Sequence, residues 1–596
     1  MSIFTLLKNN YFVLTVGVAV GLIYVLPNVF FITTMGGRYH GIPMMQTANE
    51  DFYLARIQEI VDGHPSLGSP AFFEYKNQPP LSPPVGEFIY ALPSLIFGIS
   101  PVNTLIVSRF FLPAILFFLV YYLIRQLTGN ENILANKLNA VAGALWVTLG
   151  YDLIDYRSLI NFFTSDQSFS SGFLIWARPV NPILGAVFLF SFLLFVVSLV
   201  QKKEHRIRSI FGASAFLALM IGSYFFSWGV AVSIVGVLIL IYLFLKEYRS
   251  AGNPALVLLF GFLFALPYWY MTWKASQSPW YESSVLRSGL FYTRYPLMNK
   301  LLLAVLILFV VFLVFEFFRH RKIGITYHLR HWHWFCLAFI LGGLWAYNQQ
   351  IITGRTVWPY HFVQYTIPLA IVVVMTLAFY ARRGISYGWH AFIVLVIFSS
   401  LAFGAHSQVS TYRQFYSDYE KLQSRATLFD WLNRKDKDCV VLVANQPVNS
   451  HDLNGLISAF THCNTYNYNW IFSLMPDDRI YHNYLVRLFF NGATSETIQD
   501  YLGSHKREAQ NYLFSNWKGL YGVRQFPDFS DDILPERLKK IPDDYRRFLV
   551  RDVSAELKKY RLDFILSTGP LAEPVKKQLP TIKLIEEIND YFIYQL

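Results

Sequence analysis

Two adjacent carboxylates, Glu50 and Asp51, lie shortly after the first apolar run of the chain. A carboxylate within hydrogen-bond reach of an attacking hydroxyl can take its proton, so an acid pair can serve acid–base chemistry. Acids beside a membrane span are costly unless they are used or solvated. The alternative is that both are solvated loop acids, which favour the N-terminus of a helix over 52–61 through its dipole.

The surroundings of this pair are those of a membrane protein. The chain has 596 residues, of which 54% are hydrophobic and only 15% are charged. This composition indicates several membrane-spanning helices with some soluble mass attached. The net charge of +12 is typical of the basic cytoplasmic flanks of spans and does not indicate nucleic-acid binding.

Apolar runs long enough to cross a bilayer recur through the first two thirds of the chain, and we expect about eleven spans in a mainly α-helical bundle. The first run is too long for the apolar core of a signal peptide, and no small-residue cleavage site follows it. It is therefore predicted to be a retained span. The predicted spans are 11–33, 101–124, 138–152, 180–200, 209–226, 228–246, 254–273, 299–318, 332–350, 362–381 and 388–406.

The positions of Lys and Arg predict the orientation. The basic clusters all fall on one side of the predicted spans, and the positive-inside rule assigns that side to the cytoplasm. The N-terminus is then inside, and an odd number of spans places the C-terminus outside. The clusters are Lys8, Arg125 with Lys137, 202–208, Lys246 with Arg249, 319–322, and Arg382 with Arg383.

The exoplasmic side receives the long loops, at 34–100, 151–179, 274–299 and 351–361. The cytoplasmic loops are short and basic. Because long structured loops tend to be functional, any chemistry is expected to face outside the membrane. The predicted membrane domain is 1–409.

A second domain is predicted over 410–596, where charge rises and no further spanning run appears. Helical spacing over 411–434 is followed by short apolar strands at 439–443 and 563–567, with a helix over 553–560 between them in the sequence. A further helix over 571–578 precedes strands near 582–585 and 591–594. This alternation predicts a small soluble α/β domain on the exoplasmic side.

The first exoplasmic loop shows a distinctive order of features. Glu50 and Asp51 precede an interfacial helix, a Pro79-Pro80-Leu81 turn and a second amphipathic helix over 85–97 that leads into the next span. This order resembles the first luminal loop of the GT-C superfamily of integral-membrane glycosyltransferases, such as the protein O-mannosyltransferases and the bacterial aminoarabinose transferases. Beyond the first two spans, the membrane region resembles these enzymes in architecture only.

The resemblance implies a GT-C-type bundle that takes a sugar from a polyprenyl phosphate or pyrophosphate on the exoplasmic side. An acid of the first loop would act as base or orient the acceptor. The family often shows Asp-Glu at this position, whereas the order here is Asn49-Glu50-Asp51. Both acids therefore stay candidates, with Asp51 favoured.

The leaving phosphate of such a reaction needs cationic partners, and Arg suits phosphate best. The donor-phosphate candidates are Arg178, Arg355 and His361, with Arg56 as a weaker one. The alternative for Arg178 is an interfacial residue beside an aromatic belt. The alternative for His361 is a ring that satisfies a backbone group.

A metal is an open question in the sequence. Some members of the superfamily use a divalent cation, Mg²⁺ or Mn²⁺, and others need none, so Asp166 of the second loop is a candidate metal or acceptor residue. The three cysteines show no spacing typical of zinc or iron–sulfur sites. A disulfide between Cys439 and Cys463 is chemically permitted in an exoplasmic domain, and the sequence does not give their distance.

The sequence therefore predicts a multi-pass glycosyltransferase of the plasma (cytoplasmic) membrane. Its partners would be membrane lipids, a polyprenyl-phosphate sugar donor and a glycan, lipid or protein acceptor, and not nucleic acid. One alternative is a transporter or flippase of lipid-linked glycans, which would carry charges within its spans near the midplane. The other is a non-catalytic membrane scaffold with an outer binding domain.

Overall fold

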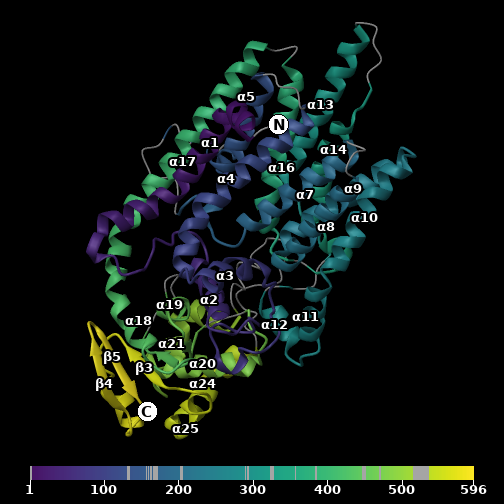
Figure 1. Ribbon diagram of the computed structural model, residues 1–596. Coiled ribbons are helices and arrows are strands. Elements are labelled where there is room, and N and C mark those ends of the chain that lie inside the picture. The colour runs from purple at the N-terminus through teal and green to yellow at the C-terminus, as the bar shows by residue number, and fades with distance from the viewer. Residues whose placement is uncertain are drawn as a thin grey trace.

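A computed structural model gives the fold of the chain (Figure 1). It describes residues 3–596 apart from 130–133, 156–157, 159, 161–163, 165–171, 202–205, 289, 291–293, 323–327, 356, 383–385, 446–451, 469–471 and 515–535.

Eleven apolar helices lie where the sequence predicts spans, counted over the described part of the chain. They are α1 (Ile3–Met35), α4 (Pro101–Leu127), α5 (Leu134–Thr148), α7 (Ile183–Gln201), α8 (Arg206–Ser223), α9 (Phe225–Phe244), α10 (Tyr248–Phe264), α13 (Lys300–Lys322), α14 (His331–Tyr347), α16 (Tyr360–Ala381) and α17 (Ser386–Leu422).

Eight of these helices are long and apolar enough to cross a membrane, within the described residues. A ninth candidate is the broken pair of α10 and α11 (Leu266–Ser276), which bends by 56°. Helices α5 and α14 have 15 and 17 residues, which is short for a bilayer crossing. The chain is thus a mainly helical, polytopic bundle.

One end of the bundle gathers the basic residues. The last turns of α7 and α16 both reach the end of α4, through Gln201 Nε2 to Gln126 O (3.4 Å) and Tyr380 Oη to Leu127 O (3.0 Å). The end of α9 meets the start of α14 through Tyr242 Oη and His331 Nδ1 (3.3 Å). Described members of the predicted basic clusters, such as Arg125, Lys246 and Arg382, lie at or beside these helix ends, and we call this the basic end.

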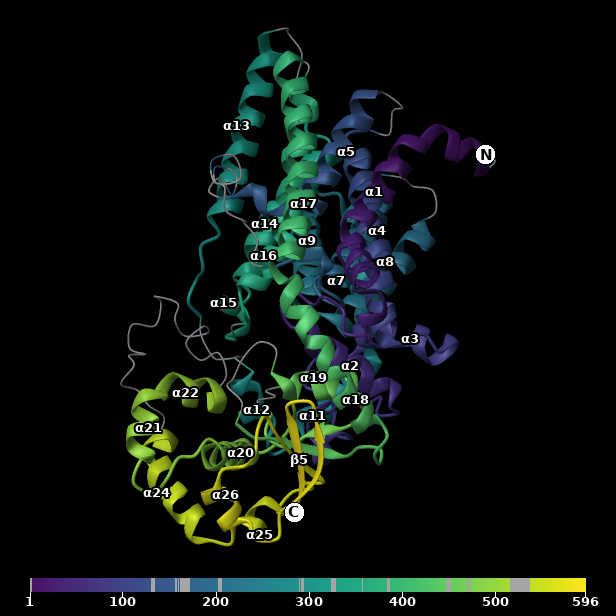
Figure 2. The same cartoon turned by 90° about the vertical axis from the view of Figure 1, so that its left-hand side faces the viewer.

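The loops and the C-terminal domain lie at the opposite end of the bundle (Figures 1 and 2). The loops carry their own short helices. These are α2 (Glu50–Val61), α3 (Val85–Phe97), α11, α12 (Tyr281–Arg287) and α15 (Gln350–Thr353), with 3₁₀ turns at Gly36–Arg38, Phe73–Tyr75, Tyr151–Ile154 and Ile175–Ala177. The expected segregation of long loops from basic clusters is therefore present.

Helix α17 joins the two parts of the molecule. Its 37 residues span about 55 Å, well beyond the roughly 30 Å of a bilayer core. The domain boundary expected at 409/410 falls inside this helix, whose last turns leave the bundle and lead into the C-terminal domain (Figure 1).

The C-terminal domain is built on a five-stranded mixed sheet of order β2-β1-β3-β5-β4. β1 (Val440–Val443) pairs in parallel with β2 (Asn464–Thr465) and β3 (Phe564–Ser567), whereas β5 (Tyr591–Gln595) runs antiparallel to β3 and to β4 (Lys583–Ile588). The four residues of β1 are all buried, which suits their unbroken apolar sequence.

The domain also carries helices, of which those within 411–434, 553–560 and 571–578 were predicted. The helices of the domain are α18 (Ala426–Asn433), α19 (Leu453–Phe460), α20 (Asp477–Phe490), α21 (Ile498–Ser504), α22 (Lys506–Phe514), α24 (Glu536–Val550), α25 (Val553–Leu557) and α26 (Glu573–Gln578). A 3₁₀ turn at Gln423–Arg425 connects α17 to α18.

The first loop and the C-terminal domain are docked on each other. The backbone N–H of Thr465 in β2 donates to the carbonyl oxygen of Ala71 (2.8 Å), and Arg479 of α20 lies 5.1 Å from the ring of Phe72. In the same interface Lys76 of the loop bridges Glu59 (2.7 Å) and Asp438 (3.2 Å). These contacts hold α2 between the bundle and the domain.

The prediction that α2 is an interfacial helix is wrong in this respect. Leu54 and Ile57 are fully buried, because α19 covers the side of α2 that would otherwise face the membrane surface or solvent. Helix α3 keeps the interfacial character, since Leu95, Ile96 and Phe97 at its end are 54–74% exposed.

Candidate functional site

Glu50 is the first residue of α2, and its carboxylate is buried in an ion pair. Oε2 binds Nη2 of Arg109, which comes from the third turn of α4, and Oε1 accepts the backbone N–H of Thr47 (2.8 Å) and its hydroxyl. Asn49, just before the helix, adopts φ = 61°, a conformation that Asn tolerates better than most residues. Glu50 is 1% exposed, so its carboxylate is fully engaged.

Arg109 extends this ion pair into a three-way junction. Its other nitrogens donate to the carbonyl oxygens of Met44 (3.0 Å) and Ala177 (3.3 Å). Glu50, the segment before α2 and the residue that precedes Arg178 are therefore held by one guanidinium. Arg109 was not predicted to be a site residue, although an Arg well inside a predicted span is itself an indication of function.

Asp51 points the other way, toward the C-terminal domain. Its Oδ1 accepts the backbone N–H of Phe52 (2.9 Å), and its Oδ2 lies 2.8 Å from the position that a Cβ on Gly455 of α19 would take. Burial raises the pKa of Asp51 to about 6, and the nearby charges of Glu50 and Asp452 act in the same direction. A carboxylate with such a pKa is suited to accept a proton near neutral pH.

Arg178 lies on the membrane side of α2. Its Nη2 donates to the hydroxyl oxygen of Tyr53 (3.3 Å), and its Cζ lies 5.4 Å from the centre of that ring. The Nε of Arg178 is buried and has no hydrogen-bond partner among the described residues. A buried guanidinium with an unused donor is well suited to an anionic ligand.

His361 belongs to the same cluster as Arg178. Its Nδ1 is 2.7 Å from the hydroxyl oxygen of Tyr224, and its ring stacks on Phe226 with centroids 4.9 Å apart. Tyr224 and Tyr365 are close enough to act electrostatically on Arg178. Tyr53, Tyr224 and Tyr365 were not predicted, because single tyrosines in an aromatic-rich chain give no signal.

The remaining predicted residues lie elsewhere or cannot be placed. Arg355 binds Glu282 of the loop over 274–299, with Nη2 at 3.0 and 3.1 Å from the two carboxylate oxygens. Arg56 is fully buried and pairs with Glu87 (2.7 Å), which ties α2 to α3. Asp166 lies outside the described residues.

Helix α2 therefore separates two groups of functional side chains. Asp51 and Tyr53 are two residues apart, so they project from nearly opposite sides of the helix, although their Cα atoms are only about 5.5 Å apart. Asp51 faces the C-terminal domain, and Tyr53 faces Arg178 and His361. Asp51 and Tyr53, the hydrogen-bond partner of Arg178, thus lie on the same turn of α2 but face opposite sides of it.

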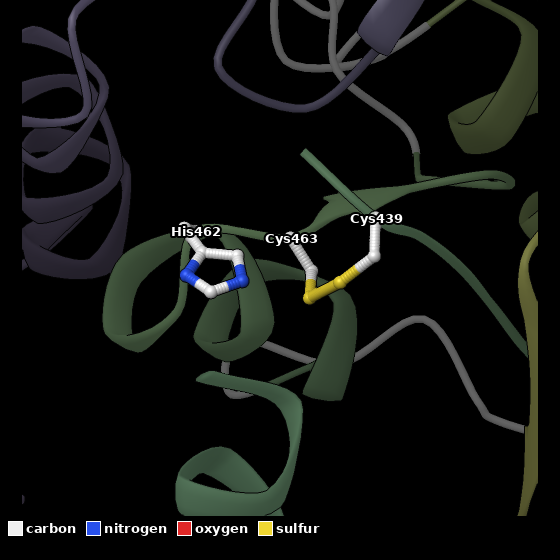
Figure 3. A group of neighbouring side chains, drawn as sticks. All are labelled: Cys439, His462 and Cys463. Carbon is white, nitrogen blue, oxygen red and sulfur yellow. A yellow bond between two sulfur atoms is a disulfide. The ribbon is translucent and has the colours of Figure 1, made fainter. Parts of the chain in front are cut away.

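Cys439 and Cys463 form a disulfide in the C-terminal domain (Figure 3). With His462 they are the one group of three potential metal ligands found in the described residues, with ligand atoms within 4.8 Å of one another. Sulfurs bonded to each other are not thiolates, so the oxidised domain holds a covalent crosslink here.

No protein-family model matches the chain, and no curated protein matches it. Among solved structures, the chain is similar to ArnT from Cupriavidus metallidurans bound to undecaprenyl phosphate, with a TM-score of 0.42 and 10% identity over 96% of this chain and 97% of that one.

Two further similar structures come from Archaeoglobus fulgidus. One is the oligosaccharyltransferase in the apo form, with a TM-score of 0.43 and 11% identity over 94% of this chain and 69% of that one. The other is the oligosaccharyltransferase AglB with an inhibitory peptide and a dolichol-phosphate, with a TM-score of 0.36 and 12% identity over 95% and 70%.

Proposed function

We propose that the protein is a GT-C-type glycosyltransferase that moves a sugar from a polyprenyl-phosphate donor to an acceptor on the exoplasmic side of the membrane. The observation that carries the proposal is the arrangement on α2. A buried carboxylate with a raised pKa, Asp51, is two residues away from Tyr53, which binds the buried Arg178.

The chemistry follows from these groups. The acceptor hydroxyl gives its proton to Asp51 as its oxygen bonds to the anomeric carbon, and the bond from that carbon to the phosphate oxygen breaks. The phosphate leaves with the bonding pair, and Arg178 with His361 stabilises its charge. Arg355 is the second cationic candidate, at the polar loop between α14 and α16.

Glu50 has a different part in this proposal. Its carboxylate is occupied by Arg109, and the same guanidinium holds Ala177 next to Arg178. Glu50 thus fixes the first turn of α2 against the segment that carries Arg178. It positions both functional groups, and Asp51 takes the proton.

Two features support an exoplasmic site. The basic clusters lie at the end of the bundle opposite the loops, which is the cytoplasmic end by the positive-inside rule. The disulfide of the C-terminal domain suits an oxidising compartment. We therefore place the loops, Asp51 and the domain outside the plasma membrane.

The proposal allows for a divalent cation that is bound by carboxylate side chains. Carboxylate oxygens are the ligands that Mg²⁺ and Mn²⁺ prefer, and the candidate from the sequence is Asp166, which lies outside the described residues. Such an ion would supply charge stabilisation for the leaving phosphate. Activity before and after EDTA treatment, with each ion added back, decides the point.

The direct test is glycolipid analysis of cells that lack the protein. The expected result is accumulation of one polyprenyl-phosphate sugar, together with loss of that sugar from a glycan, lipid or protein of the cell surface. Purified protein in vesicles should consume the accumulated lipid when extracts containing the acceptor are added. Unchanged lipid-linked sugars in the deletion strain would contradict the proposal.

The two arginine candidates make different predictions. Replacing Arg178 with Met removes the buried guanidinium beside the leaving phosphate, and we expect transfer to fall by about 10²-fold. The same change at Arg355 is expected to lower transfer less than about threefold, because Glu282 already neutralises that side chain, which is 30% exposed. Initial rates of transfer at saturating acceptor measure both losses. A larger loss in Arg355→Met than in Arg178→Met would assign the donor phosphate to Arg355.

A further inference from the structure

An apolar groove lies between α9 and α14, which run side by side in the bundle (Figures 1 and 2). Its volume is about 740 Å³, and its wall is aliphatic or aromatic apart from Asn348 at one end. The groove opens toward the surrounding lipid, because Leu240, Phe244 and Trp345 in its wall are 66%, 89% and 54% exposed. Such an apolar surface on a membrane protein is covered either by lipid or by another helix.

The groove follows α14 along most of its length. Its wall on this helix extends from Trp334 to Asn348, which corresponds to about 21 Å of helix. One leaflet of hydrocarbon is about 15 Å thick, half of the core of a bilayer. The groove is therefore long enough to hold an acyl chain whose head group lies at the membrane surface.

The side chains of the wall favour a lipid chain over a transmembrane helix. Helices that associate in membranes place Gly, Ala, Ser or Thr at the contact, so that their backbones approach closely. The pair α9 and α14 does this itself at Gly342, where a Cβ would lie 2.7 Å from the Cα of Ile234. The eleven residues of the groove wall include none of these small residues and are mostly Leu, Ile, Phe and Trp.

One mouth of the groove is positively charged. Leu245 ends the wall on α9 and is followed by Lys246, and Arg330 stands one turn before Trp334 of the α14 wall. Lys246 and Arg330 are exposed and form no ion pair within the part of the chain that the structure describes. This mouth belongs to the basic end of the bundle.

The neighbouring charges leave the mouth basic. Glu247 is the one acid between 242 and 250, and its carboxylate accepts the hydroxyl of Ser250 (3.0 Å). Arg249 offsets it with a positive charge. The ring of His331 is also at this mouth, with Nδ1 3.3 Å from the hydroxyl oxygen of Tyr242. A phosphate at this point therefore meets a net positive charge.

We propose that the groove binds an acyl chain of an anionic phospholipid from the leaflet at the basic end, with the lipid phosphate held by Lys246 and Arg330. Basic pockets between membrane helices bind anionic head groups in this way. The site is separate from the proposed donor site, since Tyr224 beside His361 precedes Val237, the first groove residue of α9, by about 20 Å of helix. The proposal does not depend on sugar transfer.

The test uses the full chain, purified in detergent, stripped of lipid and titrated with dioleoyl-phosphatidylglycerol or dioleoyl-phosphatidylcholine. Native mass spectrometry counts the lipids that stay bound. We expect one phosphatidylglycerol to bind about 30-fold more tightly than phosphatidylcholine, because each of the two cations contributes about fivefold. Equal affinity for the two lipids in the wild type would overturn the proposal.

Single substitutions at the mouth locate the phosphate. Lys246→Gln and Arg330→Gln should each lower the affinity for phosphatidylglycerol about fivefold and leave the affinity for phosphatidylcholine unchanged. Arg208→Gln removes an exposed cation at the start of α8, outside the groove and its mouth, and is the matched control. An equal loss of both lipids, or the same loss in the control, would show that this mouth does not hold the phosphate.

A second pair of variants tests the groove itself. Leu341→Trp places a larger side chain in the wall and should lower the affinity for both lipids about tenfold. Leu308→Trp, at a 45% exposed position of α13, is the control and should leave both affinities unchanged. Unchanged lipid binding in Leu341→Trp would reject the groove as the lipid site. If the same variant also shifted a dimer to a monomer, the groove would be assigned to a helix of a second copy of the chain.

Discussion

Replacing Asp51 with Asn should lower the rate of sugar transfer by about 10²- to 10⁴-fold, the range that general-base catalysis contributes. The amide is nearly the same size as the carboxylate and can still accept the N–H of Phe52, so the first turn of α2 should persist. What is lost is the ability to take a proton from the acceptor. Single-turnover transfer in vesicles, at equal protein content, measures the effect.

The pKa of Asp51 also predicts the direction in which activity changes with pH. The pKa of Asp51 is about 6, so the ionised base is present above that value and is lost as pH falls through it. Wild-type activity should therefore decline below about pH 6, and the residual activity of Asp51→Asn should lack this decline. A variant that transfers sugar at more than about a tenth of the wild-type rate would remove Asp51 from the mechanism.

Replacing Arg109 with Met should have the largest effect on stability. It leaves Glu50 as an uncompensated buried carboxylate, a change that costs about 3–5 kcal/mol when one partner of a buried pair is removed. The carbonyl oxygens of Met44 and Ala177 lose their donors as well. Thermal unfolding of the purified protein should show a lower midpoint, and the fraction recovered as a monodisperse species should fall.

Two further variants distinguish loss of the Glu50–Arg109 ion pair from a non-specific loss of stability. Glu50→Met combined with Arg109→Met should recover much of the loss, because two apolar side chains leave no buried charge. Glu420→Gln breaks the exposed pair with Arg38 and should change stability by less than about 1 kcal/mol. If Arg109→Met alone is as stable as the wild type, the junction does not hold the loop.

The helical bundle could be predicted because the length of each apolar run is a local property of the sequence. A long apolar segment in lipid satisfies its backbone hydrogen bonds within itself as a helix. The basic flanking residues then predict which end of each helix faces the cytoplasm. The strands of the C-terminal domain were likewise visible as short apolar runs. The order of these strands in the sheet could not be predicted. β2 has only two residues, and its parallel pairing with β1 needs a crossover connection that leaves no local pattern.

The roles of Glu50 and Asp51 could not be separated from the sequence for a physical reason. The two acids are neighbours with the same chemistry, and they differ only in what they face. Glu50 meets an arginine 59 residues away, whereas Asp51 meets a helix of the distant C-terminal domain. Such partners are fixed by tertiary packing, which local patterns do not encode.

The backbone hydrogen bond between Thr465 and Ala71 has a consequence for biogenesis. These residues are 394 positions apart, so at 5–20 residues per second the first loop emerges from the ribosome about 20–80 s before its strand partner exists. Throughout that interval the side of α2 that α19 covers in the folded protein lacks this partner. We expect a chaperone or the translocation machinery to shield this side of α2 until α19 (Leu453–Phe460) has been synthesised.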